Sequence, residues 1–377
     1  MRFYYLKLLI LPLAVILFPL TVLGQMDEGL QTTNFREENF KARVKEIISE
    51  EEVVNDLGQK IILQDLKLIA LSGSRQGEEV LFQGLTNQIT TKQTYNKGQV
   101  LLVTLREDAE VDGVYIDDVW RVNTLYYLTG LFLIIALFVG RGKGLRAMLS
   151  LLLTFVIIFK FTIPFISSGN NPFLITLVSS IFVILISMLL LYGWSSKSKA
   201  AMISIIISVF VASGLSYLFV WMGNLTGFGE EEAILLADTF KNQETFSGLL
   251  LAAFVLGALG ILDDVVLTQI SAVEQLKKTN SHLHPLEVYK RAMKIGTDHI
   301  ASMINTLFLA YASSAFFLMF LIQSKQPPFN NFLETINNEV VATEVVRVLV
   351  GSIGLVLAIP IATYIASFYY FKHSIKK

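Results

Sequence analysis

Eight long stretches of this 377-residue chain are predominantly apolar. A helix that crosses a bilayer needs about 20 such residues, and a backbone inside lipid has to satisfy its own hydrogen bonds, which restricts it to helices or closed barrels. Hydrophobic residues make up 53% of the chain and charged residues 16%, which is too apolar for a soluble domain. We therefore predict an α-helical polytopic membrane protein with seven or eight transmembrane helices in contact with the lipid bilayer; the stretches are 8–23, 125–140, 147–166, 173–194, 200–222, 246–262, 300–322 and 345–371.

Lysine and arginine are distributed unequally between the connections of these stretches. Connections rich in basic residues are expected in the cytoplasm, and here they contain Arg2 and Lys7; Arg141, Lys143 and Arg146; Lys197 and Lys199; Lys277, Lys278, Lys290, Arg291 and Lys294; and Lys372, Lys376 and Lys377. The alternate connections contain no basic residue or a single one, at Lys241 and Lys325. This asymmetry predicts a cell-membrane protein with both termini in the cytoplasm, provided that the first stretch is retained.

Residues 1–24 have two interpretations. A basic start, a short apolar core and the small residues of VLGQ, at 22–25, are typical of a cleavable signal peptide. The same residues suit a first transmembrane helix, which is the interpretation we prefer. In either case we expect residues 25–124 outside the cytoplasm, a helical membrane domain over 125–371 and a cytoplasmic tail over 372–377.

The segment 25–124 differs in character from the rest of the chain. Apolar and polar residues alternate in FKARVKEII and again in parts of KIILQDLKLIAL, EEVLFQG, GQVLLVTLR and YIDDVWRV, with Gly and Asn between the runs. A period of two separated by turn residues predicts β-strands. The segment is therefore expected to be a small extracytoplasmic β-rich domain, with an OB-like or SH3-like barrel as the preferred topology.

Several functional classes receive no support from the sequence. The net charge of −1 gives no reason to expect a nucleic-acid partner, and the absence of cysteine removes disulfides, thiolate metal sites and thiol catalysis. The sequence contains no recognisable serine triad, glycine-rich phosphate loop or zinc-ligand spacing. We therefore expect no enzyme activity, no cofactor and no metal site.

Two adjacent aspartates follow the sixth apolar stretch, in GILDDVVLTQ from Gly260 to Gln269. A carboxylate at the centre of a membrane helix costs about 2.5 to 3.5 kcal/mol and less near the interface. The depth of the two aspartates in the membrane therefore decides whether they mark the end of a helix or form a functional site. If the helix continues, Asp264 shares a face with Thr268 and Ser271, whereas Asp263 points about 100° away. Asp264 is therefore the main candidate.

A second group of polar residues begins the seventh stretch. Asp298, Ser302 and Asn305 share one helix face, and His299 lies on an overlapping one. Helices joined by one cytoplasmic loop are antiparallel, so we expect Asp264 at the level of these residues, in a shared site for a cation, a proton or a polar solute. The alternative is structural: the aspartate pair marks an interfacial helix end, and Asp298 caps the next helix.

The segments GALGILDDVVLTQISAVEQLK and KIGTDHIASMINTLFLAYAS resemble the YibE/F family of bacterial multi-pass membrane proteins. The family pattern is matched at Leu262, Asp263, Asp264, Thr268, Gln269, Ser271, Ala272, Glu274, Leu276, Gly296, Asp298, His299, Asn305, Thr306, Leu307, Leu309, Ala310 and Tyr311. Thr297 stands where the family usually has arginine, so a counter-charge role for that arginine does not carry over. The outer segment makes the chain similar to the longer YibE type, which implies a YibF-like partner subunit but no particular activity.

Two functions remain open at this point. The first is a transport or permease-type protein with a polar site near the cytoplasmic side. The second is an accessory membrane subunit that docks a YibF-like partner, or forms a homo-oligomer, and has no substrate of its own. An intramembrane aspartyl protease is a weaker third, because its Gly-x-Gly-Asp surround is matched here only by Gly260 before Asp263.

Overall fold

A computed structural model describes residues 36–54, 60–85, 94–107, 113–229, 231–237, 240 and 243–374. The first apolar stretch and the choice between signal peptide and anchor lie outside these residues. Within the described ranges, the chain divides into two compact units, residues 36–139 and residues 140–374. Each unit is described by itself.

The first unit contains an antiparallel sheet of five strands with the order β3-β2-β1-β4-β5. The strands are β1 (Arg36–Val54), β2 (Lys60–Ala70), β3 (Glu79–Gln83), β4 (Val100–Glu107) and β5 (Gly113–Val119). The alternating residues predicted this, because every second side chain points to the same face. One face buries Phe40, Leu66, Phe82 and Leu101 at 0–1% exposure, and the predicted β-rich segment is confirmed.

The helical part of the chain begins with α3 (Val122–Ile157), which has a kink at Arg141, where φ is 49° and ψ is −133°. After the break the helix continues through a π-helical turn (Ile158–Thr162) into α4 (Ile163–Ser167). The stretches 125–140 and 147–166 thus lie on the two helices that meet at this kink, within a run of 46 residues, Val122–Ser167. A straight helix of that length would measure about 69 Å, more than twice the apolar thickness of a bilayer.

The other helices are α5 (Pro172–Tyr192), α6 (Ser196–Met222), α7 (Glu231–Leu236), α8 (Gln243–Thr279), α9 (Pro285–Ser314), α10 (Phe316–Gln323), α11 (Phe332–Asn337) and α12 (Glu339–Ser374). Over the described ranges, five helices are long and apolar enough to cross a membrane, or six if α9 and α10, which meet at 71°, form one span. The expected count of seven or eight differs because one stretch lies outside these ranges and the two stretches on either side of the kink at Arg141 are counted as one run.

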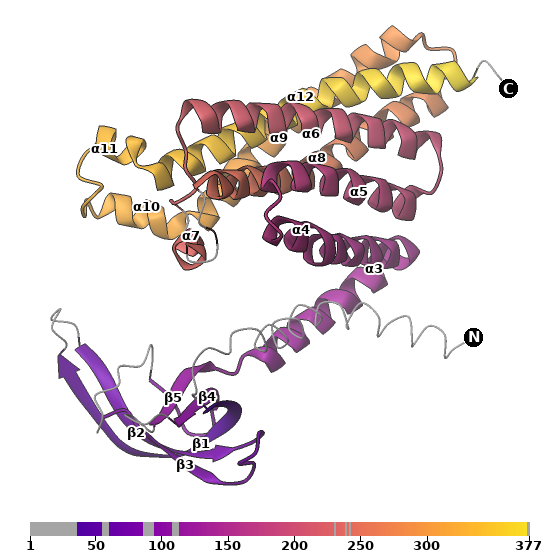
Figure 1. Ribbon diagram of the computed structural model, residues 1–377. Helices are drawn as coiled ribbons and strands as arrows, with labels where there is room; N and C mark the ends of the chain where they lie inside the picture. The colour runs from indigo at the N-terminus through magenta and orange to yellow at the C-terminus, as the bar shows by residue number, and fades with distance from the viewer. Residues whose placement is uncertain are drawn as a thin grey trace, which may run out of the picture. The chain divides into compact units, whose positions relative to one another are not determined.

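Five long helices form the centre of the helical unit. α12 packs against α6, α8 and α9, and α8 packs also against α5 and α6 (Figure 1). Small side chains allow this close approach; for example, a Cβ atom added to Gly354 of α12 would lie 3.1 Å from the Cβ of Ala212 of α6. Buried Ser204 and Ser216 of α6 donate hydrogen bonds to carbonyls four residues earlier in the same helix.

Candidate functional site

The depth of the two aspartates can be measured against α5. This helix has 21 residues, and its length of about 31 Å matches the apolar core of a bilayer. At its first residue, Pro172 lies against Gly248 of α8, because a Cβ atom on Gly248 would be 2.9 Å from the Cδ of Pro172. At its other end, the ring centroid of Tyr192 lies 4.9 Å from the Nζ of Lys197, which also binds Ser271 of α8. The two helices are therefore parallel, and the end of α5 is level with α8 about five residues beyond Asp263.

A second contact gives the same depth. Lys197, at the start of α6, donates a hydrogen bond of 2.6 Å to the Oγ of Ser271, and its Nζ lies 3.7 Å from the carboxylate of Glu274. Asp263 precedes Ser271 by eight residues, which is about 12 Å along a helix. If the basic end of α6 marks the membrane boundary, both aspartates lie inside the apolar layer.

The environments of the two carboxylates differ. Asp263 is partly buried, and its Oδ1 is fully buried with no hydrogen-bond partner. Asp264 is exposed on the surface of the unit, and its backbone carbonyl accepts a hydrogen bond of 2.8 Å from the hydroxyl of Thr268. Helical geometry explains the difference, because neighbouring side chains point about 100° apart. Burial therefore favours Asp263 over Asp264 as the residue of a site inside the bundle.

Gln269 connects three helices. Its buried side-chain amide donates hydrogen bonds of 2.9 Å to the carbonyl of Ala292 in α9 and 2.7 Å to the hydroxyl of Thr363 in α12. Thr363 in turn donates to the carbonyl of Ile359. Gly296 makes room for this arrangement, since a Cβ atom there would lie 2.6 Å from the Cγ2 of Ile359. The geometry explains Gln269 and Gly296 by helix packing.

The α9 residues predicted for the site lie near the level of Asp264. Two contacts fix the pairing of α8 and α9. Gln269 binds the carbonyl of Ala292, and a Cβ atom added to Gly257 would lie 3.5 Å from the Tyr311 hydroxyl. This pairing brings Asp264 close to the level of His299. Asp298, Ser302 and Asn305 are exposed and His299 is half-buried. Across the part of the chain that the structure describes, no hydrogen bond or ion pair joins Asp264 to these residues, and no group of three metal-ligating side chains occurs.

Charged and aromatic residues that sequence reasoning did not assign to the site lie where the start of α6 meets α8. The Nζ of Lys197 lies 4.9 Å from the ring centroid of Tyr192, and Glu274 also binds Lys278 at 2.7 Å. The position of Lys197 directly after an apolar stretch was the available signal, but its partners depend on how α6 packs against α8. In the other half of the unit, Arg347 of α12 forms an ion pair of 3.5 Å with Glu344.

Apolar helices of bilayer length, packed through small residues and carrying charged side chains at depth, define a multi-pass membrane protein. Comparison with known protein families agrees with the resemblance of the aspartate and histidine motifs. The chain belongs to the YibE/F-like family, whose model, described as YibE/F-like protein, matches residues 128–372. The match covers the helical part and leaves the sheet outside. No curated protein and no solved structure matches the chain.

Proposed function

We propose that this protein is a transport or permease-type protein of a bacterial cell membrane, with a cation- or proton-binding site at Asp263 in the cytoplasmic half of its helical unit. The observation that carries the proposal is the buried Oδ1 of Asp263, which has no hydrogen-bond partner. A buried acceptor of this kind is costly unless a cation or a proton satisfies it. Ionisable residues inside membrane helices are typical of ion and proton pathways.

The depth of the aspartates supports this proposal against the structural alternative. A helix-boundary role requires a solvated pair, whereas the contacts of Pro172 and Lys197 support a position of both residues inside the apolar layer. Lys197 is already engaged with Ser271 and Glu274. We therefore assign Asp263 as the ion ligand and Lys197 as a residue that anchors α6 to α8.

The proposal can be tested by the thermal stability of the purified full-length protein in detergent. Chlorides of sodium, potassium, magnesium and calcium are compared with choline chloride at constant ionic strength, followed by a pH series. A ligand that binds the folded state at 100 times its Kd stabilises it by about 2.7 kcal/mol. We expect one cation, or protons, to raise the Tm of the wild type and to have no effect on Asp263→Asn.

Asp264→Asn is the matched control, because it makes the same chemical change one residue away on the exposed side. The Tm of this variant should still rise with the ion, but at a higher ion concentration, because loss of the neighbouring negative charge weakens the binding of a cation at Asp263. A wild type whose stability depends on none of these ions or on pH would refute the site. If the rise in Tm with the ion is lost in Asp264→Asn and kept in Asp263→Asn, the ion binds the carboxylate of Asp264.

The second candidate, an accessory subunit that docks a membrane partner, is favoured by one observation. Asp264, Thr268 and Asp298 are exposed on the surface of the helical unit, and polar side chains facing lipid are costly. A YibF-like subunit or a second copy of the chain would cover them. In a pull-down from native membranes, Asp264→Asn would then lose a co-purifying subunit that Asp263→Asn retains.

For the sheet unit we propose a small, partly open barrel of the OB type on the extracytoplasmic side. The central strand β1 pairs with β2 and β4, and the two edge strands, β3 and β5, are in contact. This cyclic arrangement of five strands would leave short edges, as partly closed barrels do. A folded spacer between membrane and solvent remains the simplest role for this unit.

A further inference from the structure

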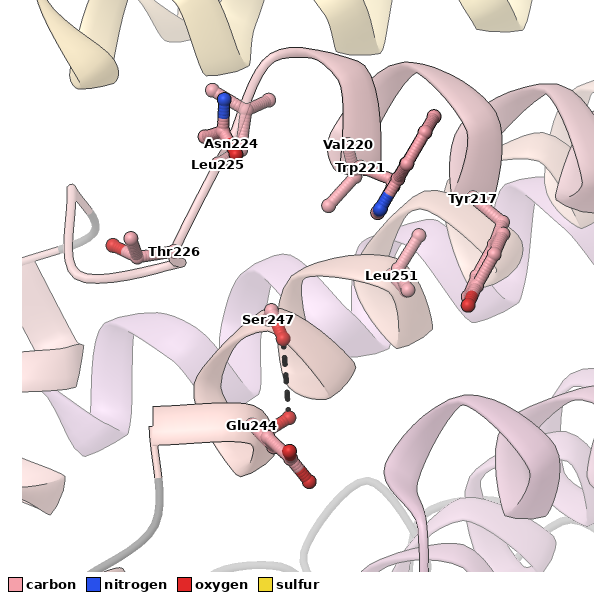
Figure 2. A pocket seen from close by; sticks show the side chains of 9 residues that line it. All are labelled: Tyr217, Val220, Trp221, Asn224, Leu225, Thr226, Glu244, Ser247 and Leu251. Carbon is pink, nitrogen blue, oxygen red and sulfur yellow. Dashed lines mark hydrogen bonds between the residues drawn. The ribbon is translucent and has the colours of Figure 1, made fainter.

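A surface pocket of about 410 Å³ lies at the end of α6 and the beginning of α8, away from Asp263. Figure 2 shows how it is built: Tyr217, Val220 and Trp221 come from α6, Ser247 and Leu251 come from α8, and the loop that follows α6 completes it. The remaining lining residues are Asn224, Leu225, Thr226 and Glu244. The side chains of Tyr217 and Trp221 are 56% and 69% exposed.

The polarity of the lining residues changes along the helices. The polar residues lie at the helix ends and in the loop: Asn224 and Thr226 follow the end of α6 at Met222, and Glu244 and Ser247 precede Gly248, which is level with the start of α5. The deeper lining is apolar, formed by Tyr217, Val220 and Leu251. A tryptophan at a helix end is typical of a residue at the bilayer interface. The pocket therefore passes from polar to apolar in the direction in which a membrane lipid does.

We propose that this pocket binds one phospholipid of the leaflet opposite the Asp263 site, with an ammonium-bearing, zwitterionic headgroup. The glycerol and ester groups would lie beside Asn224 and Ser247, and the upper part of one acyl chain would lie against Tyr217 and Leu251. Glu244 is the one charged residue among those that line the pocket. Its carboxylate favours an ammonium group and repels an anionic headgroup, and the exposed rings of Trp221 and Tyr217 add attraction for cations.

The structure of the loop supports a preformed site. The carboxylate of Glu339, at the start of α12, accepts hydrogen bonds from the backbone N–H groups of Thr226 and Gly227 at 2.6 and 2.9 Å, and from the Thr226 hydroxyl at 2.8 Å. Gly227, with φ of 85°, lies against the carbonyl of Phe246, which would be 2.5 Å from an added Cβ atom. One side of the pocket is thus held in place without a ligand.

The test uses Trp221 as the reporter, in full-length protein in nanodiscs of a phosphatidylcholine host. Increasing fractions of phosphatidylethanolamine or phosphatidylglycerol, each brominated on the upper acyl chain, are added, and the signal of Trp221 is isolated by subtraction of a Trp221→Phe variant. We expect saturable quenching by the ethanolamine lipid at low mole fraction, with at least a several-fold weaker effect of the glycerol lipid. Free ethanolamine should not compete.

Two variants and one control separate this site from ordinary lipid contact. Ser247→Phe fills the pocket and should abolish the saturable component, whereas Ile207→Phe, on an exposed part of α6, should leave it unchanged. Glu244→Gln should bring the two lipids within about twofold of each other. Equal, non-saturable quenching by both lipids in the wild type would show bulk lipid only and overturn the proposal, and so would competition by free ethanolamine, which would assign a soluble amine.

Discussion

Gly296→Ala tests whether the Gln269 cluster sets how α8, α9 and α12 pack. A Cβ atom at position 296 would lie 2.6 Å from the Cγ2 of Ile359 and 3.0 and 3.2 Å from the side-chain amide atoms of Gln269. The amide cannot move away without stretching its hydrogen bonds to Ala292 and Thr363. The backbone of α9 therefore has to shift, and we expect the free energy of unfolding to fall.

The magnitude follows from two opposing effects. Forcing an extra carbon into a packed interior costs about 1 to 3 kcal/mol, and replacing glycine by alanine inside a helix gains about 0.8 to 1.0 kcal/mol. Gly260→Ala in α8 is the matched control, because its Cβ atom would have nothing within 4 Å, so this variant keeps only the gain. The two variants should differ by about 1 to 3 kcal/mol in stability, since only the steric cost separates them.

The assay is thermal unfolding of the purified full-length variants in one detergent, where each kcal/mol corresponds to about 2 to 4 °C in Tm. Ile359→Leu removes the branch at Cβ that carries Cγ2. The double variant Gly296→Ala with Ile359→Leu should therefore lose less stability than the two single losses added together. If Gly296→Ala is as stable as Gly260→Ala, the close packing around Gln269 is not present and the assignment of Gln269 to packing fails.

Three further predictions concern the membrane topology, the sheet unit and the loop that Glu339 binds. Single cysteines at Ser74 and Asn280, introduced into this cysteine-free chain, should react with an impermeant thiol reagent in intact cells at Ser74 alone; labelling at Asn280 would contradict the topology. The sheet unit alone should give a strand-dominated circular dichroism spectrum and melt cooperatively. Hydrogen bonds from Lys45 and Lys67 to Glu79 hold the pKa of its carboxyl at about 2 against an ordinary 4.5. The stability of the sheet unit should therefore fall as the pH drops from 4.5 towards 2, and Glu79→Gln should reduce this pH dependence. Glu339→Gln should lower the Tm of the full chain, because charge-assisted hydrogen bonds contribute about 1.5 to 3 kcal/mol and the carboxylate accepts from both Thr226 and Gly227; an unchanged Tm would show that it does not hold the loop.

The periodic features of the fold could be predicted from the sequence, because periodicity is local. Alternation in residues such as Phe40 to Ile48 predicted strands, and long apolar stretches predicted helices such as α5 and α6, whose ends the structure places within a few residues of the predicted ones. The break at Arg141 lies in the predicted connection between two apolar stretches, where two helices meet at a kink.

The details of the candidate site could not be predicted, because they depend on the register between helices. The apolar stretch 246–262 ends at the aspartates, yet α8 continues to Thr279, so the end of the stretch does not mark the end of the helix. The contacts that fix the depth, from Pro172 to Gly248 and from Lys197 to Ser271, join residues on different helices. The helix face of Gln269 likewise gave no indication that its partners would be Ala292 and Thr363.

The different environments of Asp263 and Asp264 also bear on the two proposed functions, which do not exclude each other. Asp263 points into the helical unit, and Asp264, one residue later, points out of it. A cationic side chain of a partner docked beside Asp264 would cancel the negative charge nearest to Asp263, and would therefore weaken the binding of a cation there. Because coupling between two binding equilibria is reciprocal, a cation at Asp263 would weaken the docking of the partner by the same factor. One turn of α8 would then be sufficient to link the occupancy of an internal ion site to assembly at the surface.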